Sequence, residues 1–389
     1  MRVINVSFYY DNSIKTEEEL LKNHFVTVVF AEALQRKGVD IIVMQRFFRD
    51  SYFKKNNVQY YFIKDKFSGN FKPWQLPYKF LKRIAALDAD IVHLHTFPCN
   101  IPAFVLRFLL NKKCGMIIQN HGDKGLKGIR AIVYKNMSHA ADAFFFTSVE
   151  QGQNWFKNRD LLKKVMPVLE GSPVFNFETW DRNRVLAYVS RKEARLKSGM
   201  QGNPLFLWVG TLDENKDPLT ILRGMEILFK NYTKASLYLI YNDHKLLKSV
   251  QDRINSSESL CNRVQLLGKI PHTLMERYYN SADYFVLGSH YEAMGFSLSE
   301  ALSCGCVPIV TDIPSFRRIT DEGKLGALWE TGNENAFVEA VQKVMKKPLE
   351  EEANNCIEFF KRNLSSDAIA ATTVSHYKKI IAARNQKDK

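Results

Sequence analysis

Short apolar runs alternate with segments of helical periodicity along almost the whole chain, and this alternation constrains the fold more than any other feature of the sequence. The runs have the length and the β-branched or aromatic content of buried strands. The predicted strands of the first half are Arg2–Phe8, Asp40–Gln45, Gln59–Ile63, Ile91–Thr96, Met116–Asn120 and Ala143–Thr147. Those of the second half are Leu205–Val209, Leu237–Tyr241, Val264–Leu267, Tyr284–Leu287, Val307–Val310 and Leu325–Trp329. Because strand–helix–strand units build parallel sheets covered by helices, an α/β protein is predicted.

Predicted helices fill the intervals between these strands. They include Glu18–Lys37, Leu76–Leu87, Ile101–Leu110, Pro218–Lys230, Lys245–Ile254, Leu274–Ser281 and Ala336–Met345. The alternation stops at Glu170-Gly171-Ser172-Pro173 and then restarts, and a length of 389 residues favours two domains over one. We therefore predict two Rossmann-like domains, residues 1–170 and 171–365, followed by a C-terminal segment, residues 366–389. The stretch Asn363–Lys389 has the pattern of an amphipathic helix with a basic tail.

The composition is that of an ordinary globular protein, with 46% hydrophobic and 25% charged residues. No apolar stretch approaches the roughly 20 residues that a membrane-spanning helix needs. The opening MRVINVSFYY is predicted to be a first strand and not a signal peptide, because it has no small-residue cleavage site. The six cysteines show neither metal-ligand nor disulfide spacing. These features favour a cytoplasmic protein.

The net charge of +14 is distributed unevenly. Residues 1–170 carry 26 Lys and Arg against 15 Asp and Glu, whereas residues 171–389 carry 29 against 26. The basic first half favours an anionic partner, either an acidic acceptor or the inner face of an anionic membrane. Its basic stretches include Lys79-Phe80-Leu81-Lys82-Arg83 and Lys124 to Arg130. The first has the composition of a peripheral membrane helix, although its two apolar side chains would equally suit the core. No nucleic-acid partner is expected, because no zinc finger or RNP-like aromatic pattern is present.

The stretch HYEAMGFSLSEALSCGCVP, residues 290–308, places two glutamates on either side of a glycine-containing turn. Glu292 follows the predicted strand Tyr284–Leu287, and Gly295 precedes a predicted helix that carries Glu300. A helix N-terminus offers unpaired N–H groups and about half a positive charge, so it binds phosphate, and glycine lets a ligand approach the backbone. Carboxylates beside a phosphate site are suited to accept from hydroxyls. The pattern favours a ligand with hydroxyls on both sides of a phosphate, such as a sugar nucleotide; the alternative is two solvated glutamates.

Other polar residues also follow predicted strands, and ligands of open α/β sheets bind at the carboxyl ends of strands. His95 ends the strand that starts at Ile91, His121 follows the strand that starts at Met116, and a Lys-containing loop follows the strand that starts at Leu205. By contrast, Asp88-Ala89-Asp90 precedes its strand. An acidic pair of this kind can hold a metal ion, but at this end of the strand we interpret it as a solvated turn. No metal site is predicted.

Several motifs together resemble those of family 4 glycosyltransferases, which are retaining enzymes. The carrying motifs are Glu292-x7-Glu300 with Gly295-Phe296-Ser297 inside it and Ala301 to Pro308 after it, Asp90 to His95, Gln119 to Gly122, Val209 to Pro218 and Leu267 to Ile270. They extend along most of the chain. The resemblance implies the GT-B architecture, in which two Rossmann-like domains face each other. Residues 1–170 would then lie on the acceptor side, residues 171–365 would bind the nucleotide sugar, and a helix over residues 366–389 would return to the first domain.

The resemblance also implies roles for individual residues. His121 and Glu292 would be the catalytic residues; Glu292 would bind hydroxyls of the donor sugar, and His121 would contact this sugar from the opposite domain. Lys216 would neutralise the pyrophosphate, and Glu300 would bind the ribose hydroxyls. Without the resemblance, His121 would be interpreted as a loop-capping histidine and Lys216 as a solvated lysine.

The remaining donor contacts implied by the resemblance lie in loops and at a helix start. They are Thr211, Gly268, Lys269, Ile270, Gly295, Phe296 and Ser297, of which the last three would hold the distal phosphate through backbone N–H groups. The sequence departs from the family in three places, one of which is the glycine-poor Tyr241-Asn242-Asp243 after the second predicted strand of residues 171–365. Thr211 stands where many members have an Arg, a charge that Arg317 or Arg318 would have to replace. Tyr9 to Ser13 occupies the place of the usual glycine-rich acceptor loop.

The function implied by the resemblance is transfer of a sugar from a nucleoside-diphosphate sugar to a sugar, lipid-linked or other glycan acceptor. The product would belong to a polysaccharide, lipopolysaccharide or other glycoconjugate. The helix N-terminus and Lys216 would stabilise the diphosphate leaving group electrostatically, so neither a metal nor another cofactor is expected. Two alternatives stay open: another GT-B enzyme, such as an epimerase or a phosphorylase, and a sugar-nucleotide-binding protein without turnover. A phosphorylase would need a pyridoxal-phosphate lysine, which no motif identifies.

Overall fold

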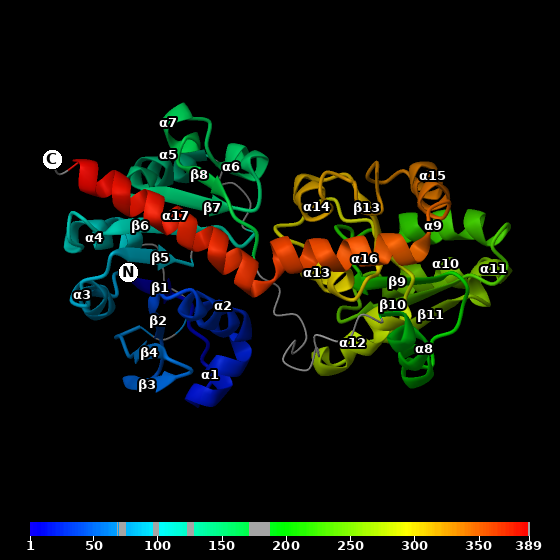
Figure 1. Cartoon of the computed structure of the whole chain (residues 1–389), viewed down its shortest axis with the longest axis horizontal. Coiled ribbons are helices and arrows are strands. Elements are labelled where there is room, and N and C mark those ends of the chain that lie inside the picture. The colour runs from blue at the N-terminus through cyan, green and yellow to red at the C-terminus, as the bar shows by residue number, and fades with distance from the viewer. Residues whose placement is uncertain (68, 70–74, 96–100, 123–127, 171–186, 388–389) are drawn as a thin grey trace. The chain divides into compact units, whose positions relative to one another are not determined.

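The computed structural model describes residues 1–67, 69, 75–95, 101–122, 128–170 and 187–387. It divides into two compact units, one formed by Met1–Pro173 with Ser366–Lys389 and the other by Val174–Ser365. Each unit has a sheet with helices packed on it (Figure 1). The predicted restart of the alternation at Gly171-Ser172-Pro173 lies outside the described residues, as does most of the basic stretch from Lys124 to Arg130.

The sheet of the first unit contains, within the described residues, eight strands in the order β3-β4-β2-β1-β5-β6-β7-β8. The strands are β1 (Arg2–Ser7), β2 (Asp40–Arg46), β3 (Ser51–Lys55), β4 (Val58–Ile63), β5 (Ile91–Leu94), β6 (Gly115–Gln119), β7 (Ala143–Phe146) and β8 (Val165–Pro167). Neighbours are parallel except for the antiparallel edge pair β3 and β4. The strand order reverses between β1 and β5, and ligands of such sheets bind at this switch point.

Two strands of this sheet, β3 and β8, are absent from the sequence-based prediction. The edge strand β3 has the sequence SYFKK and no fully buried residue, so its apolar content is too low to mark a strand. Strand β8 has only three residues. The other six strands coincide with predicted strands to within two residues at each end.

The helices of the first unit include two that replace one predicted helix. They are α1 (Glu17–Asn23), α2 (Phe25–Arg36), α3 (Tyr78–Ala85), α4 (Ile101–Leu109), α5 (Gly128–Met137), α6 (Val149–Trp155) and α7 (Arg159–Leu162), with a 3-10 turn at Ser138–Ala140. The predicted helix Glu18–Lys37 is interrupted at His24, whose φ of −105° and ψ of 34° are not helical. Helix α1 begins with a capping box, in which Thr16 Oγ1 accepts from the N–H of Glu19 at 3.1 Å.

The C-terminal helix α17 (Ser366–Lys387) packs on the first unit, against α2 and β6. Arg36 pairs with Asp367 near its start, and Arg384 pairs with Asp142 near its end. Between these ion pairs, the hydroxyl of the fully buried Tyr377 lies 2.7 Å from Nδ1 of a buried histidine on β5. The last segment of the chain is therefore a structural part of the first unit.

Helix α3 carries the basic stretch Lys79-Phe80-Leu81-Lys82-Arg83, for which the sequence left two interpretations open. Phe80 and Leu81 are each 0% exposed and belong to the core of the first unit, whereas the three cations are exposed. The interpretation of this stretch as a helix that inserts apolar side chains into a membrane is therefore wrong. The apolar side of α3 packs in the core, so the side that faces solvent is the one that carries the three cations.

The sheet of the second unit contains, in the described part of the chain, six parallel strands in the order β11-β10-β9-β12-β13-β14. They are β9 (Leu205–Gly210), β10 (Ser236–Tyr241), β11 (Val264–Gly268), β12 (Tyr284–Leu287), β13 (Val307–Thr311) and β14 (Ala327–Trp329). This is the 3-2-1-4-5-6 order of dinucleotide-binding sheets, with its switch point between β9 and β12. All six strands lie at predicted positions; the interior strands β9, β10, β12 and β13 are largely buried and therefore form nearly continuous apolar runs.

The helices of the second unit leave the carboxyl ends of β9 and β12 uncovered, so that a site can form there. They are α8 (Ala187–Ser198), α9 (Pro218–Phe229), α10 (Leu247–Asn255), α11 (Glu258–Cys261), α12 (His272–Ser281), α13 (Phe296–Ser303), α14 (Pro314–Ile319), α15 (Glu334–Val344) and α16 (Leu349–Phe359), with a π turn at Phe360–Leu364. Arg191 and Arg195 of α8 both bind Asp283, which directly precedes β12, at 3.2 and 2.8 Å. This ion-pair cluster fastens the amino end of β12, opposite the switch point.

Candidate functional site

A pocket of about 420 Å³ lies at the carboxyl ends of the central strands of the second unit. Its walls come from the loops after β9, β10 and β11 and from the starts of α12 and α13. The lining residues are Val209, Gly210, Thr211, Lys216, Ile240, Tyr241, Asn242, Lys269, Ile270, Pro271, His272, Met275, Ser297 and Glu300. Six predicted site residues are among them: Thr211, Lys216, Lys269, Ile270, Ser297 and Glu300. The other predicted donor contacts of this unit do not line the pocket: Gly268 ends β11, Glu292 and Gly295 lie between β12 and α13, and Phe296 begins α13.

The loop after β9 is held in shape by its own polar groups. Thr211 Oγ1 donates to Asp213 Oδ2 at 2.7 Å, and Asp213 Oδ1 accepts from the N–H of Lys216 at 2.9 Å. Asn215 Nδ2 donates to the carbonyl of Tyr291 at 3.0 Å, which ties this loop to the one after β12. The turn therefore presents Lys216 in a defined place beside the second loop.

Lys216 and Glu292 form an ion pair at the junction of these two loops. Their side chains are 17% and 12% exposed, so the pair is largely shielded from solvent screening. Ser289 Oγ also donates to Glu292 Oε1, at 2.7 Å. The pair keeps one cation and one carboxylate at the carboxyl ends of β9 and β12, where an anionic group and a hydroxyl could each find a partner.

Helix α13 begins at the pocket with Gly295 as its N-cap, in the left-handed region at φ 79° and ψ 62°. A Cβ at this position would lie 2.7 Å from a ring carbon of Phe316, so both conformation and space require glycine. The backbone N–H groups of Phe296 and Ser297 have no hydrogen-bond acceptor in the described part of the chain. Free N–H groups at a helix N-terminus, together with the helix dipole, are suited to an anion, and these two lie at the pocket edge.

Glu300 is held on the inner wall of the pocket by two partners from α12. Tyr279 donates its hydroxyl to Glu300 Oε2 at 2.8 Å, and His272 Nε2 lies 2.8 Å from Oε1. The hydrogen bond to Glu300 raises the pKa of His272, which favours the imidazolium. Burial, together with the nearby carboxylate, raises the pKa of Tyr279 far above its usual value. Each carboxylate oxygen keeps further acceptor capacity for a ligand hydroxyl.

The sequence-based prediction misses four polar residues: Tyr241, Asn242 and His272, which line the pocket, and Tyr279, which holds Glu300. Asn242 directly follows β10, so the rule that ligands bind at the carboxyl ends of strands could have identified it. His272 and Tyr279 carried no such signal, because their importance comes from contacts with a glutamate 28 and 21 residues further along the chain.

The structure does not bring Arg317 or Arg318 to the pocket, although the sequence named them as replacements for an arginine at Thr211. Arg317 instead pairs with Asp312, with Nη2 to Oδ2 at 2.8 Å, and both side chains are exposed. Neither arginine is among the lining residues, which include Lys216 and Lys269. The hypothesis that one of these arginines replaces the missing charge therefore gains no support from the pocket lining and stays a prediction.

His121 belongs to the first unit, where it follows β6 and joins a polar cluster. Its Nδ1 lies 2.8 Å from Glu170 Oε1, and its Nε2 lies 3.1 Å from His95 Nδ1. His95 in turn stacks on His93, with ring centroids 4.4 Å apart. Burial lowers the pKa of His93 to about 3 and that of His95 well below its usual value, so both are neutral. Glu170 and His95 thus fix the orientation of the His121 ring from both sides.

Two Rossmann-like units, with a phosphate-suited helix N-terminus at the switch point of the second, define the GT-B class of proteins. A solved structure of a glycosyltransferase from Rickettsia africae ESF-5 has this fold, with a TM-score of 0.71, 15% identity and 98% of both chains covered. The family model described as "Glycosyl transferases group 1" matches residues 190–362, and the model "Glycosyltransferase Family 4" matches residues 25–159. The chain belongs to the group 1, family 4 glycosyltransferases.

The matches to curated relatives cover only part of the length of each relative. A GDP-mannose:cellobiosyl-diphosphopolyprenol alpha-mannosyltransferase from Xanthomonas campestris is 22% identical over 263 residues, which are 66% of this chain and 65% of the relative. A UDP-Gal:alpha-D-GlcNAc-diphosphoundecaprenol alpha-1,3-galactosyltransferase from Escherichia coli is 29% identical over 157 residues, 39% of each chain. The matched parts therefore span 65% and 39% of the length of these two relatives.

Proposed function

We propose that this chain is a glycosyltransferase that moves a sugar from a nucleoside-diphosphate sugar to an acceptor during glycoconjugate synthesis. The observation that supports this proposal is that a lysine, two glutamates and a helix N-terminus lie together at the switch point of the second unit. The cation and the helix N-terminus suit a diphosphate, and the carboxylates suit hydroxyl groups. A nucleoside diphosphate with a sugar on its far side presents these groups in this order.

The donor is proposed to lie across the pocket with its nucleoside toward α12. Glu300 accepts from the ribose hydroxyls, and Lys269 and Ile270, which follow Gly268, border the base. The N–H groups at Gly295, Phe296 and Ser297 hold the distal phosphate. A pocket of about 420 Å³ is within the size range of small-molecule sites.

Lys216 and Glu292 are proposed to exchange their mutual ion pair for contacts with the donor. Lys216 then neutralises the diphosphate, and Glu292 accepts from hydroxyls of the sugar. In the reaction, the bond between the anomeric carbon and the phosphate oxygen breaks while a bond to the acceptor oxygen forms. The transition state resembles an oxocarbenium ion, so a stabilised diphosphate lowers the barrier. Two lysines and a helix N-terminus supply the positive field, and the proposal uses no metal or other cofactor.

The stereochemical course is proposed to be retention. The acceptor hydroxyl attacks from the face that the leaving group vacates, and its proton passes to the leaving phosphate oxygen. His121 is proposed to contact the donor sugar from the first unit, with its ring oriented by Glu170 and His95. His121 and Glu292 are therefore the proposed catalytic residues.

The acceptor is proposed to be a lipid-linked saccharide. This rests on the names of the two relatives, which act on sugars attached to diphosphopolyprenol or diphosphoundecaprenol. Such an acceptor lies in a membrane, so we propose peripheral contact with an anionic membrane at its inner face. In the described part of the chain, no helix combines the length and apolar character needed to cross a membrane.

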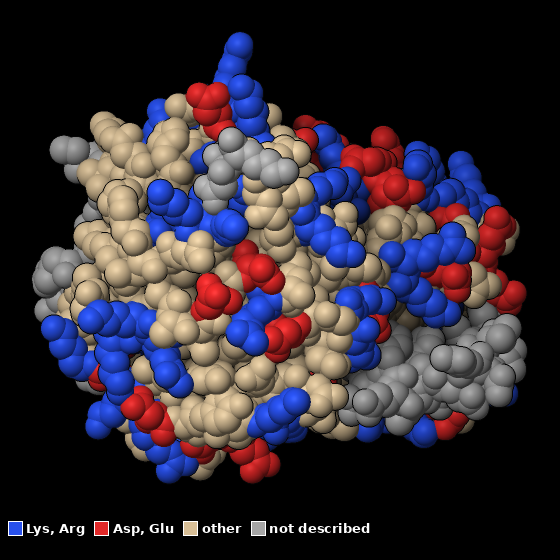
Figure 2. Space-filling view, turned by 60° about the vertical axis from the view of Figure 1, so that its left-hand side comes forward, with Lys and Arg blue, Asp and Glu red and all other residues tan. Residues whose placement is uncertain are grey.

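The surface of the first unit offers groups for such a contact. Phe108 on α4 is 73% exposed, and Ile132 and Val133 on α5 are 61% and 51% exposed. Lys and Arg side chains are spread over the face seen in Figure 2, with wide uncharged areas between them. Exposed apolar side chains near cations are typical of peripheral membrane binding.

A panel of radiolabelled nucleotide sugars tests the proposal. The full chain is incubated with UDP-, GDP-, ADP- and dTDP-sugars and a polyprenyl-diphosphate-linked saccharide, and lipid-extractable label is counted. Transfer from at least one donor is expected, and the variants Glu292→Gln and Lys216→Gln should lose most of it. Lys343→Gln, an exposed change on α15, is the matched control. Epimerised free sugar nucleotide, or binding without turnover across the panel, would contradict transfer and support one of the two alternatives.

A further inference from the structure

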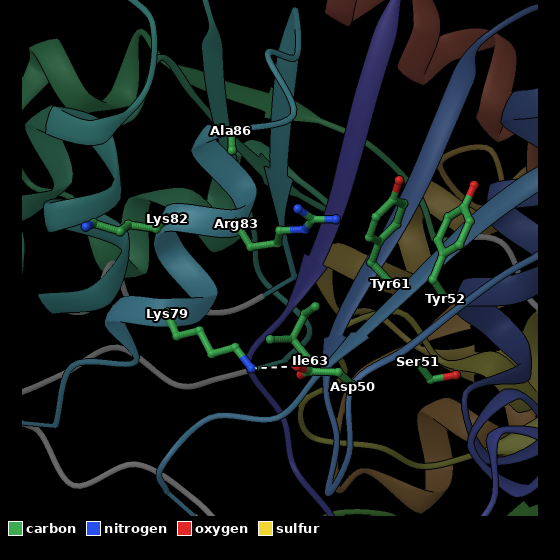
Figure 3. A pocket seen from close by; sticks show the side chains of 9 residues that line it. All are labelled: Asp50, Ser51, Tyr52, Tyr61, Ile63, Lys79, Lys82, Arg83 and Ala86. Carbon is green, nitrogen blue, oxygen red and sulfur yellow. Dashed lines mark hydrogen bonds and ion pairs between the residues drawn. The ribbon is translucent and has the colours of Figure 1, made fainter.

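A second cavity, of about 570 Å³, lies in the first unit beside α3, and the proposed donor chemistry does not use it. Its lining residues are Asp50, Ser51, Tyr52, Tyr61, Ile63, Lys79, Lys82, Arg83 and Ala86. Figure 3 shows α3 on one side of this groove and the β3–β4 edge of the sheet on the other. It shares no residue with the pocket at the switch point of the second unit.

The groove lies where the packing of α3 meets the packing of the paired strands β3 and β4. Helix α3 buries Phe80, Leu81 and Ile84 in the core, so its opposite face is free to carry charge. Strands β3 and β4 pair Tyr52 directly with Tyr61, and the two rings lie 4.6 Å apart. Because side chains alternate along a strand, both rings fall on the same face of the sheet edge.

The two tyrosines form an aromatic floor that solvent can reach. Tyr52 is 60% exposed, whereas Tyr61 is partly buried. The two hydroxyl groups point the same way in Figure 3. Burial, and then the neighbouring Tyr52, raise the pKa of Tyr61, so its hydroxyl stays protonated and able to donate. A flat ring with a polar tip suits a ligand that has both an apolar face and hydroxyl groups, as a sugar ring has.

Cationic side chains surround the two tyrosines, and few carboxylates neutralise them. The guanidinium of Arg83 extends from α3 over the ring of Tyr61, 5.5 Å from its centroid, as Figure 3 shows. Within the described residues, no carboxylate lies within ion-pair distance of Arg83, of Lys82 or of the exposed Lys54 on β3. Only Lys79 is paired, with Asp50 at 2.6 Å. The groove therefore carries a net positive charge over an aromatic surface.

The geometry points to a binding site for a phosphate-bearing saccharide in this groove. The sugar ring would stack on Tyr52 and receive hydrogen bonds from the tyrosine hydroxyls, and the phosphate would pair with Arg83. The assignment of a saccharide rests on the proposed function, since a glycosyltransferase handles saccharide acceptors. The same chemistry is present in a free sugar phosphate and in the head of a polyprenyl-diphosphate sugar. The groove would thus recognise the acceptor side of the reaction, apart from the donor pocket.

Titration calorimetry on the full chain tests this site with glucose 1-phosphate, glucose and inorganic phosphate as probes. The donor pocket is first saturated with whichever nucleoside diphosphate binds it, because glucose 1-phosphate resembles part of a donor. Glucose 1-phosphate should bind, and glucose and phosphate alone should bind about tenfold more weakly or worse. Arg83→Gln and Tyr52→Ala should each weaken glucose 1-phosphate binding about tenfold, since each removes one of the two recognition elements. Lys22→Gln, an exposed change on α1, is the matched control and should have no effect.

Several results would overturn the inference. If Arg83→Gln, Tyr52→Ala and the unmodified chain bind glucose 1-phosphate with equal affinity, the groove does not bind it. Equal affinity for phosphate and glucose 1-phosphate would reduce it to an anion site, and tighter Arg83-dependent binding of an RNA oligonucleotide would identify a different partner. Micelles containing undecaprenyl-diphosphate-linked N-acetylglucosamine distinguish the two sources, because a lipid-linked ligand should compete with glucose 1-phosphate. Nucleoside diphosphate binding is measured in every variant, so failure of the groove and failure of the proposed donor site are seen separately.

Discussion

Replacing Glu300 by alanine is expected to weaken nucleoside diphosphate binding while the fold is retained. The carboxylate is proposed to accept from the ribose hydroxyls, and hydrogen bonds to a charged group contribute about 1.5–3 kcal/mol. The affinity should therefore fall roughly 10- to 150-fold, as measured by titration calorimetry with the nucleoside diphosphate that the donor panel selects. Glu339→Ala on α15, a helical glutamate change at an exposed position that does not line the pocket, is the control.

The same substitution should also lower the free energy of unfolding, and this effect has a different cause from the loss of nucleotide affinity. Tyr279 is 0% exposed and donates its hydroxyl to Glu300, so Glu300→Ala leaves this donor buried without its acceptor. An unsatisfied buried group costs about 1–3 kcal/mol. The double variant Glu300→Ala with Tyr279→Phe removes donor and acceptor together and should recover much of the unfolding free energy in denaturant titrations. It should not recover nucleotide affinity.

Two outcomes would refute this reasoning. Unchanged nucleotide affinity in a folded Glu300→Ala protein would exclude this carboxylate from the site. Recovery of affinity in the double variant would mean that Glu300 acts by supporting α12 rather than by contacting the nucleotide. The ratio of the affinities of the two variants is therefore more informative than either value alone.

Three further predictions concern the pocket and the C-terminal helix. Gly295→Ala should lower both the melting temperature and nucleotide affinity, because a Cβ would meet Phe316 at 2.7 Å and φ is 79°; an unchanged melting temperature would contradict this. The pKa of His272 is raised by Glu300, so the stabilisation by this pair should be complete below the unfolded value of about 6.5 and disappear as pH rises through the folded pKa. Denaturant titrations over this range, with His272→Gln as the pH-insensitive control, measure it. Tyr377→Phe should destabilise the first unit by about 1–3 kcal/mol, since it leaves Nδ1 of the buried His93 without its partner; equal stability of variant and parent would argue against this contribution.

The central strands of both sheets were predictable from sequence, and the two edge strands of the first sheet, β3 and β8, were not. Strands such as β12 are buried on both faces, so every residue is apolar and local composition is enough to identify them. The edge strand β3 is polar at three of its five positions and is held by pairing with β4, which is a tertiary contact. The break at His24 is of the same kind, because the apolar pattern of α1 and α2 continues across it and only the backbone geometry shows the end of one helix.

The sequence by itself determined that Gly295 opens a helix, that Glu292 follows a strand and that both lie at the carboxyl edge of a parallel sheet. These properties depend on residues that are adjacent in the chain. Only the tertiary structure decided that Glu292 pairs with Lys216, 76 residues away, and that Glu300 is held by two residues of α12. It also placed Arg83 over Tyr61, although these residues belong to a helix and a strand with no shared motif. The physical reason is that side-chain pairing depends on which loops the sheet order brings together, and local periodicity carries no information about that order.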